Sequence, residues 1–218
     1  MPDSPIFANA AVDLFLKGGP IMYPIAVVTL VAVCIFIERV FWWLRFATKR
    51  SPKQLDEVYV ILEAGDLTKA ITQSAQSSDP VVRMVHHGLQ HRHTSMQGAL
   101  EVAAGQELRD AGRFLSAMDT IVTLAPLLGL LGTVTGIMGS FTSMGSSELA
   151  VEKVTGGIGE ALIATAAGLG IAIGTLVPMN YFYARLAALK FDLEAAANNV
   201  LILAAQHGFD KVGAKTAN

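Results

Sequence analysis

The chain has 218 residues, of which 52% are hydrophobic and only 16% are charged, whereas an average soluble domain is roughly 25% charged. The formal net charge of -2 provides no basic surface for nucleic acid, so no nucleic-acid partner is expected. One cysteine excludes an internal disulfide framework and a cysteine-rich metal module. The apolar content excludes a disordered chain. A membrane protein, or a soluble protein with an unusually large apolar core, remains.

Three uncharged stretches favour the membrane protein. They cover residues 18–37, 120–147 and 161–184. Twenty residues form a helix of about 30 Å, which matches the hydrocarbon thickness of a bilayer. The sequence therefore predicts an all-α membrane protein with three transmembrane helices that contact membrane lipid. No pattern typical of a β-strand is present.

Lysine and arginine residues near the ends of the spans predict the orientation. Eight of them fall on one side, namely Arg45, Lys49, Arg50, Lys53, Arg109, Arg113, Arg185 and Lys190. Only Lys17 and Lys153 fall on the other side. Because cytoplasmic segments carry the excess of basic residues, the N-terminus is predicted to face outward and the C-terminus to be cytoplasmic.

The region after the first span is predicted to be helical. The apolar spacing over residues 53–64 is typical of a helix, and Asp66 is predicted to cap the next one. Asp79 followed by Pro80 indicates the N-terminus of a third helix.

Spans two and three are predicted to extend into a cytoplasmic helical bundle. No helix breaker separates Ser95 from span two, so one helix is predicted from Ser95 to about Ser143. Span three is predicted to continue to about Gln206. The expected organisation is an N-terminal tail (1–19), span one (20–46), a cytoplasmic helical region (47–94), the long helix with span two (95–144), an outer loop (145–156), span three with its extension (157–206) and a cytoplasmic tail (207–218).

Spans two and three each carry a face of small residues at helical spacing. In span two this face consists of Gly129, Gly132, Thr133, Gly136 and Ser140. In span three it consists of Gly157, Ala161, Ala164, Thr165, Gly168 and Ala172. Two interpretations remain open: the faces allow close helix packing, or part of them lines a shared cavity.

Two acidic positions are candidate functional residues. Glu160 lies near the outer end of span three, and a carboxylate inside the membrane is costly unless it has a function. The alternative is an interfacial residue that pairs with Lys153. Glu38 and Arg39, near the inner end of span one, are expected to form a snorkelling pair or an ion pair across helices.

No enzymatic, cofactor or metal site is expected. The cluster of His86, His87, His91 and His93 has no acidic residue that would complete a recognised metal site, so it is interpreted as a solvated helix surface. The sequence contains no phosphate-binding loop, nucleophile elbow or Ser/His/Asp arrangement. We therefore expect neither catalytic residues nor a cofactor.

Two sequence motifs, in spans two and three, indicate a particular protein family. Span two contains Ala125-Pro-Leu-Leu-Gly-Leu-Leu-Gly-Thr-Val134 followed by Gly136-Ile-Met138, and span three contains Gly157-Ile-Gly-Glu-Ala-Leu-Ile-Ala-Thr-Ala-Ala-Gly-Leu169. Both closely resemble the ExbB/TolQ/MotA family of ion-driven motor subunits. Gly18-Gly-Pro-Ile-Met-Tyr-Pro24 with Glu38-Arg39 resembles the first span of the ExbB-type members. The resemblance covers about residues 18 to 205.

The resemblance implies a homo-oligomeric ring, five subunits in the ExbB-type complexes. Such a ring encloses a single-span partner similar to ExbD or TolR, whose membrane helix carries an aspartate, and the complex acts on a periplasmic protein of TonB or TolA type. Thr133 and Thr165 match the polar threonines of the family's spans two and three, and Glu160 matches its span-three glutamate. These three residues are expected to form the ion pathway and to face the partner.

The resemblance implies a multi-pass subunit of the bacterial inner membrane, with a periplasmic N-terminus and a cytoplasmic C-terminus. Its expected function is energy transduction driven by the proton-motive force, which couples ion flow to import or envelope maintenance. The transported ion is expected to be a proton, although the additional hydroxyl of Thr135 leaves sodium open. Two alternatives are a flagellar-type stator subunit, whose MotA-type members have four spans, and a non-conducting membrane scaffold.

Overall fold

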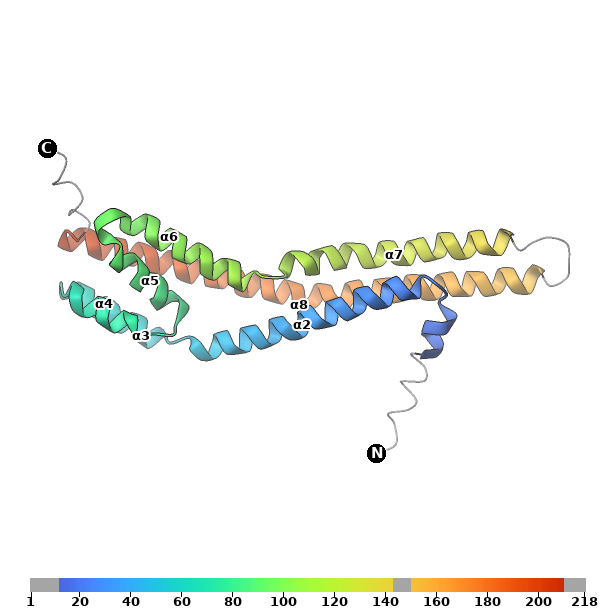
Figure 1. Cartoon of the computed structure of the whole chain (residues 1–218), viewed down its shortest axis with the longest axis horizontal. Helices are drawn as coiled ribbons and strands as arrows, with labels where there is room; N and C mark the ends of the chain where they lie inside the picture. Colours follow the sequence, from blue (N-terminus) through green and yellow to red (C-terminus); the bar gives the residue numbers. More distant parts are fainter. Residues whose placement is uncertain (1–11, 143–149, 210–218) are drawn as a thin grey trace, which may run out of the picture. The chain divides into compact units, whose positions relative to one another are not determined.

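The computed structural model describes residues 12–142 and 150–209, and within these ranges it contains helices and no β-strand. After a short helical segment at residues 12–17, the helices are α2 (Met22–Lys49), α3 (Pro52–Glu63), α4 (Leu67–Ala75), α5 (Pro80–Gln90), α6 (Arg92–Ala111), α7 (Leu115–Thr142) and α8 (Ala150–His207) (Figure 1). The predicted all-α fold is confirmed.

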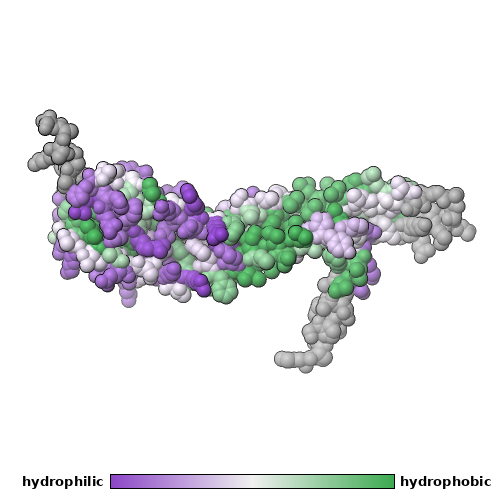
Figure 2. Space-filling model, in the orientation of Figure 1, coloured by the Kyte–Doolittle hydropathy of each residue, from purple (hydrophilic) through white to green (hydrophobic). Residues whose placement is uncertain are grey.

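Three helical segments are long and apolar enough to cross a membrane, as predicted. They are Met22–Lys49, Arg92–Thr142, which includes α7, and Val154–His207 within α8. Large apolar side chains such as Val27, Leu30 and Phe41 are more than half exposed, which suits contact with lipid. Figure 2 shows hydrophobic residues gathered over α2 and α7, whereas hydrophilic residues cover α3 to α6.

The described residues divide into two compact units. The first comprises the residues up to Arg39 together with Phe114–Tyr181, and the second comprises Val40–Arg113 and the residues from Phe182 onward. Helices α2 and α8 contribute to both units. The first unit contains the apolar parts of the three spans, and the second contains the short amphipathic helices.

The prediction of one continuous helix over residues 95–144 is wrong. The helix ends at Ala111 and a new one begins at Leu115. Between them Phe114 adopts a φ of 64°, a left-handed conformation that a right-handed helix cannot contain. The aromatic ring of Phe114 lies 5.8 Å from the guanidinium carbon of Arg39, within the range of a cation–π interaction. Gly112, the C-cap residue of α6, is the local signal for this break.

The ends of the other long segments also differ in part from the prediction. Helix α8 begins at Ala150, so residues 150–156, expected in the outer loop, are helical because the chain from 150 to 155 contains neither glycine nor proline. Helix α8 ends at His207, one residue beyond the expected Gln206. Most of the predicted tails at 1–19 and 207–218 and the first part of the loop lie outside the described residues.

In the first unit, helices α7 and α8 lie against each other through small residues. A Cβ atom added to Gly129 would lie 2.9 Å from the Cα of Thr165 and 3.0 Å from the carbonyl oxygen of Ala164, and one added to Gly168 would overlap the carbonyl oxygen of Ala125. Ala161 and Ala172 of the same face are buried. The two backbones are therefore in direct contact, the arrangement that small residues permit in membranes.

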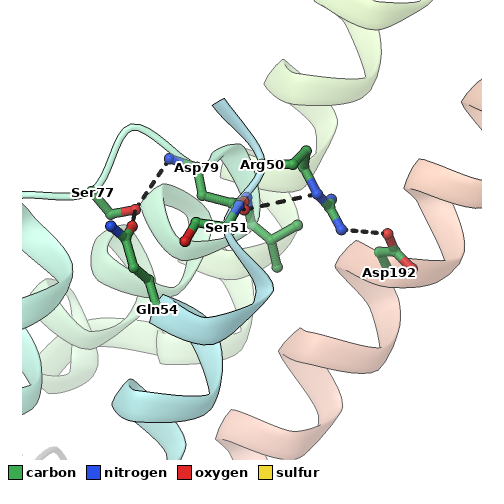
Figure 3. Close-up of polar contacts among 7 residues, drawn as sticks. Arg50, Ser51, Gln54, Ser77, Asp79 and Asp192 are labelled. Atoms are coloured by element: carbon green, nitrogen blue, oxygen red, sulfur yellow. Dashed lines mark hydrogen bonds and ion pairs between the residues drawn. The ribbon is translucent and has the colours of Figure 1, made fainter. Parts of the chain in front are cut away.

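In the second unit, a buried carboxylate joins the start of α3 to the start of α5. Asp79 is only 2% exposed, and its side chain accepts hydrogen bonds from the backbone N–H of Val81 at 2.8 Å and of Ser51 at 2.6 Å. The guanidinium group of Arg50 lies between two carboxylates (Figure 3). Its Nε atom is 3.8 Å from Oδ2 of Asp79, and its Nη2 atom is 2.7 Å from Oδ2 of Asp192 in α8. The predicted helix cap at Asp79 is confirmed, and it also anchors the neighbouring segment.

A second polar contact connects α3 with α8. The phenol of Tyr59 hydrogen-bonds to the side chain of Asn199, and burial raises the pKa of this phenol above its usual value although the hydrogen bond opposes the shift. The predicted cap at Asp66 is also confirmed, since its carboxylate accepts a hydrogen bond from the backbone N–H of Lys69 at 3.0 Å.

Substitution of the buried cap should weaken the second unit. Asp79→Ala leaves two backbone donors without their acceptor, so the free energy of unfolding should fall by about 2 to 4 kcal/mol. Asp66→Ala, at an exposed cap with one such bond, should lower it by about 1 kcal/mol. Thermal unfolding in a mild detergent, followed by circular dichroism, measures both variants. Equal losses would show that Asp79 acts only as a helix cap.

A second prediction concerns the contact between α7 and α8. Gly168→Ala places a methyl group against the backbone of α7, which should lower the free energy of unfolding by about 1 to 3 kcal/mol. Gly170→Ala in the same helix, where the added Cβ has no neighbour within 4 Å, is the matched control and should be neutral or slightly stabilising. Melting temperatures that do not distinguish the two variants would contradict the close contact.

Candidate functional site

A cavity of about 550 Å³ lies in the first unit between α7, α8 and the segment that precedes α2. Its lining residues are Pro20, Ile21, Gly132, Thr135, Gly136, Gly139, Ser140, Gly157 and Glu160. Four members of the predicted small-residue faces, Gly132, Gly136, Ser140 and Gly157, are among them. The faces therefore contribute both to helix packing and to the wall of a cavity, the two interpretations that the sequence left open.

Glu160 provides the charge in this cavity. It lies ten residues into α8, within the apolar segment that begins at Val154, and its side chain is partly exposed. The carboxyl group lies directly against Gly19, where an added Cβ would overlap Oε1 and Cδ of Glu160. The side chain of Lys153, the alternative partner considered for Glu160, lies outside the described residues.

Hydroxyl groups lie near Glu160 along α7. The Ser140 hydroxyl donates to the carbonyl oxygen of Gly136 at 2.8 Å, and the Thr135 hydroxyl contacts the carbonyl oxygens of Leu131 at 3.0 Å and Gly132 at 3.2 Å. Each hydroxyl oxygen keeps lone pairs that can accept a hydrogen bond from water or from a protonated acid. The cavity therefore combines one carboxyl group with hydrogen-bond acceptors inside an apolar segment.

The two threonines predicted for the ion pathway do not line this cavity. The Thr165 hydroxyl donates to the carbonyl oxygen of Gly129 in α7 at 2.9 Å, so within one chain Thr165 joins the two helices. The Thr133 hydroxyl donates to the carbonyl oxygen of Leu130 in its own helix at 2.6 Å. Both side chains are partly exposed. The structure thus brings Glu160 together with Thr135 and Ser140 rather than with Thr133 or Thr165.

Glu38 and Arg39 form an ion pair within α2. Nε of Arg39 lies 2.5 Å from Oε2 of Glu38, and Nη2 lies 2.8 Å from Oε1. Arg39 is completely buried, whereas the Glu38 side chain is 40% exposed. The arginine therefore does not snorkel toward water, and the adjacent Glu38 is one of its partners. A buried guanidinium needs such a partner, since removal of one member leaves an uncompensated charge.

Sequence reasoning missed the contribution of the segment before α2. Pro20 and Ile21 line the cavity, and Gly19 contacts Glu160. Consecutive glycines followed by proline at 18–20 are a turn signal, but nothing in the sequence places this turn beside span three. The contribution of Thr135 and Gly139 was also missed, because they lie beside the predicted small-residue face and not on it.

Comparisons with known proteins identify the family of the chain. Residues 76–195 match the MotA/TolQ/ExbB proton channel family. The chain is 35% identical over 189 residues to the biopolymer transport protein ExbB-like 1 of Synechocystis, an alignment that covers 81% of this chain and 73% of that protein. It is 37% identical over 174 residues to ExbB-like 3 of the same organism, with 77% and 82% covered. ExbB of Salmonella typhimurium is 33% identical over 163 residues, with 73% and 66% covered.

The family match includes α7 and the part of α8 that bears Glu160. Together with three helices able to cross a membrane, the comparisons show a multi-pass protein of the inner membrane. The chain belongs to the MotA/TolQ/ExbB proton channel family.

Proposed function

We propose that the chain is the ring-forming subunit of an energy transducer of ExbB/TolQ type, driven by the proton-motive force. The observation that carries this proposal is the position of Glu160: in a chain of a proton channel family, the carboxyl group lies in the wall of a cavity inside a membrane-spanning segment. An ionisable group at such a position is costly and is typical of proton pathways.

Glu160 would act at the outer entrance of the pathway. With the N-terminus in the periplasm, as the distribution of basic residues favours, the end of α8 that bears Glu160 faces the outside. A carboxylate at this entrance attracts cations and exchanges protons with water in the cavity. Thr135 and Ser140 supply hydrogen-bond acceptors for that water.

Thr133 and Thr165 would act deeper in the membrane, where they face the partner. Since each hydroxyl donates its hydrogen to a carbonyl of this chain, each offers only acceptor lone pairs to a further group. A protonated partner aspartate can donate to such an oxygen, whereas a deprotonated one cannot. The two threonines would therefore favour the neutral form of the partner, and the same lone pairs could bind sodium if that ion replaced the proton.

The partner would be a single-span protein similar to ExbD or TolR with an aspartate in its membrane helix, enclosed by a ring of five copies of this chain. The names of relatives support a partner of this type, since they include biopolymer transport proteins and, in Haemophilus influenzae, the Tol-Pal system protein TolQ. The work would be done in the periplasm or at the outer membrane, through a protein of TonB or TolA type, in import or envelope maintenance.

Substitution of Glu160 tests the conducting function. The complex, purified through this chain from its native membrane, is reconstituted into vesicles, and proton uptake under an imposed potential is followed with a pH-sensitive dye. Glu160→Gln keeps the size of the side chain and removes its charge, so uptake should fall by about tenfold or more, in the range that loss of one proton-transfer group produces. The assembly should remain intact, because Glu160 lies in a cavity wall.

The matched control is Ser140→Ala, which alters the same cavity without removing its charge. Its uptake should fall much less than that of Glu160→Gln, since the carboxyl group and the Thr135 hydroxyl remain in the cavity. Wild-type uptake in Glu160→Gln would reject the conducting role. A non-conducting scaffold would then be the better description of the chain.

Thr165 has a structural contribution that must be separated from its proposed role. Thr165→Val removes the hydrogen bond to Gly129, so it should lower the free energy of unfolding by about 1 kcal/mol as well as proton uptake. Thr165→Ser keeps the hydroxyl and should retain both. Thermal unfolding and proton uptake, measured on the same preparations, distinguish the effects. Full uptake in a destabilised Thr165→Val variant would show that Thr165 serves only helix packing.

A further inference from the structure

The segment before α2 contacts Glu160 at a glycine that two independent constraints require. Gly19 has a φ of +70°, a conformation that residues with a Cβ adopt only under strain. An added Cβ would also overlap Oε1 and Cδ of Glu160 and lie 2.9 Å from its Cγ. The first constraint concerns the backbone alone, whereas the second concerns the position of the glutamate.

The backbone of Gly19 is held in place on both sides of this contact. Its carbonyl oxygen accepts a hydrogen bond from the N–H of Met22 at 3.1 Å, which fixes the turn that starts α2. Met22 and Ile25 form a buried apolar cluster with Ala164 of α8, one helical turn after Glu160. This apolar cluster therefore holds the start of α2, and with it Gly19, against α8 beside Glu160.

The same segment forms part of the cavity wall. Pro20 and Ile21 line the cavity together with Glu160. The carboxyl group thus lies between the Gly19 backbone on one side and the cavity on the other. A side chain at position 19 would push the carboxyl group away from this wall.

We propose that Gly19 is a positioning residue for Glu160: by lacking a side chain, it lets the carboxyl group lie against the start of α2 at the wall of the cavity. The proposal rests on the conducting function proposed above for Glu160. It assigns to the Gly-Gly-Pro turn the task of orienting an acid that belongs to span three.

The test uses Gly19→Ala in the complete complex. A displaced carboxyl group should lower proton uptake by about tenfold or more, because a shift of about 1 Å in an acting group can cost up to about a hundredfold. A water-soluble carbodiimide with an amine reports the position of Glu160 directly, since mass spectrometry measures its conversion to an amide. Glu160 should be modified faster in Gly19→Ala, as the carboxyl group moves into the cavity.

Gly208→Ala is the matched control for backbone strain. Gly208 has a φ of +71°, and an added Cβ would have no neighbour within 4 Å. This variant imposes the same unfavourable conformation without any contact to Glu160. Its proton uptake and Glu160 modification should equal those of the wild type.

Glu160→Asp separates positioning from a merely structural effect at position 19. The shorter acid should lower uptake when residue 19 is glycine, because it no longer reaches its position. It should raise uptake in the Gly19→Ala background, because it avoids the added methyl group. Such a reversal of sign is direct evidence that the two positions are coupled.

The proposal is overturned if Glu160→Asp lowers uptake equally in both backgrounds, or if Glu160 is modified at the wild-type rate in Gly19→Ala. Should Gly19→Ala not be recovered from membranes, recovery of the Gly19→Ala/Glu160→Asp double variant supports the proposal, and loss of both contradicts it. Failure of the conducting function is distinguishable, since Glu160→Gln would then keep wild-type uptake while the modification rates still report the position of Glu160.

Discussion

The direct backbone contact between α7 and α8 is the constraint on which the first unit depends. Two membrane helices gain little from apolar burial against each other, because lipid is as apolar as a leucine side chain. They associate where small residues let the backbones approach, and Gly129 and Gly168 provide this approach. The hydroxyl of Thr165 adds a hydrogen bond to Gly129 at the same place.

The cavity follows from the same arrangement. Beside the small-residue faces, the segment before α2 contributes Pro20 and Ile21, and the cavity lies between this segment and the glycines of the two helices. A carboxyl group in this space can exchange protons with water without crossing lipid. Close packing and a polar cavity are thus two consequences of one run of small residues, and a choice between them is not required.

The parts of the fold that depend on neighbouring residues in the sequence, namely the spans and the helix caps, were predicted correctly. The three spans follow from uncharged stretches, and the caps at Asp66 and Asp79 follow from the preference of helix N-termini for carboxylates. The break between α6 and α7 has a local signal in Gly112, the C-cap residue of α6. The left-handed conformation of Phe114 could not be predicted, because phenylalanine rarely adopts it. The complete burial of Arg39 was also not predicted, because its contact with Phe114 joins residues that are distant in the sequence.

In the candidate site, too, some residues were predicted from local sequence, whereas others depend on contacts between distant parts of the chain. The position of Glu160 inside a span made it a candidate functional residue from the sequence alone, and the resemblance to the family made Thr133 and Thr165 candidates as well. Its neighbours could not be predicted, since Gly19 and Pro20 lie about 140 residues earlier in the chain. A turn signal such as Gly-Gly-Pro predicts that the chain bends, but it does not indicate which helix lies beside the bend.

We propose that this chain forms a ring around a partner whose membrane helix carries an aspartate. Native mass spectrometry of the complex, released from its own membrane through this chain, tests the claim most directly. We expect five copies of the chain together with a single-span protein that has an aspartate in its membrane helix. A monomer, or an oligomer without such a partner under several mild detergents, would contradict it.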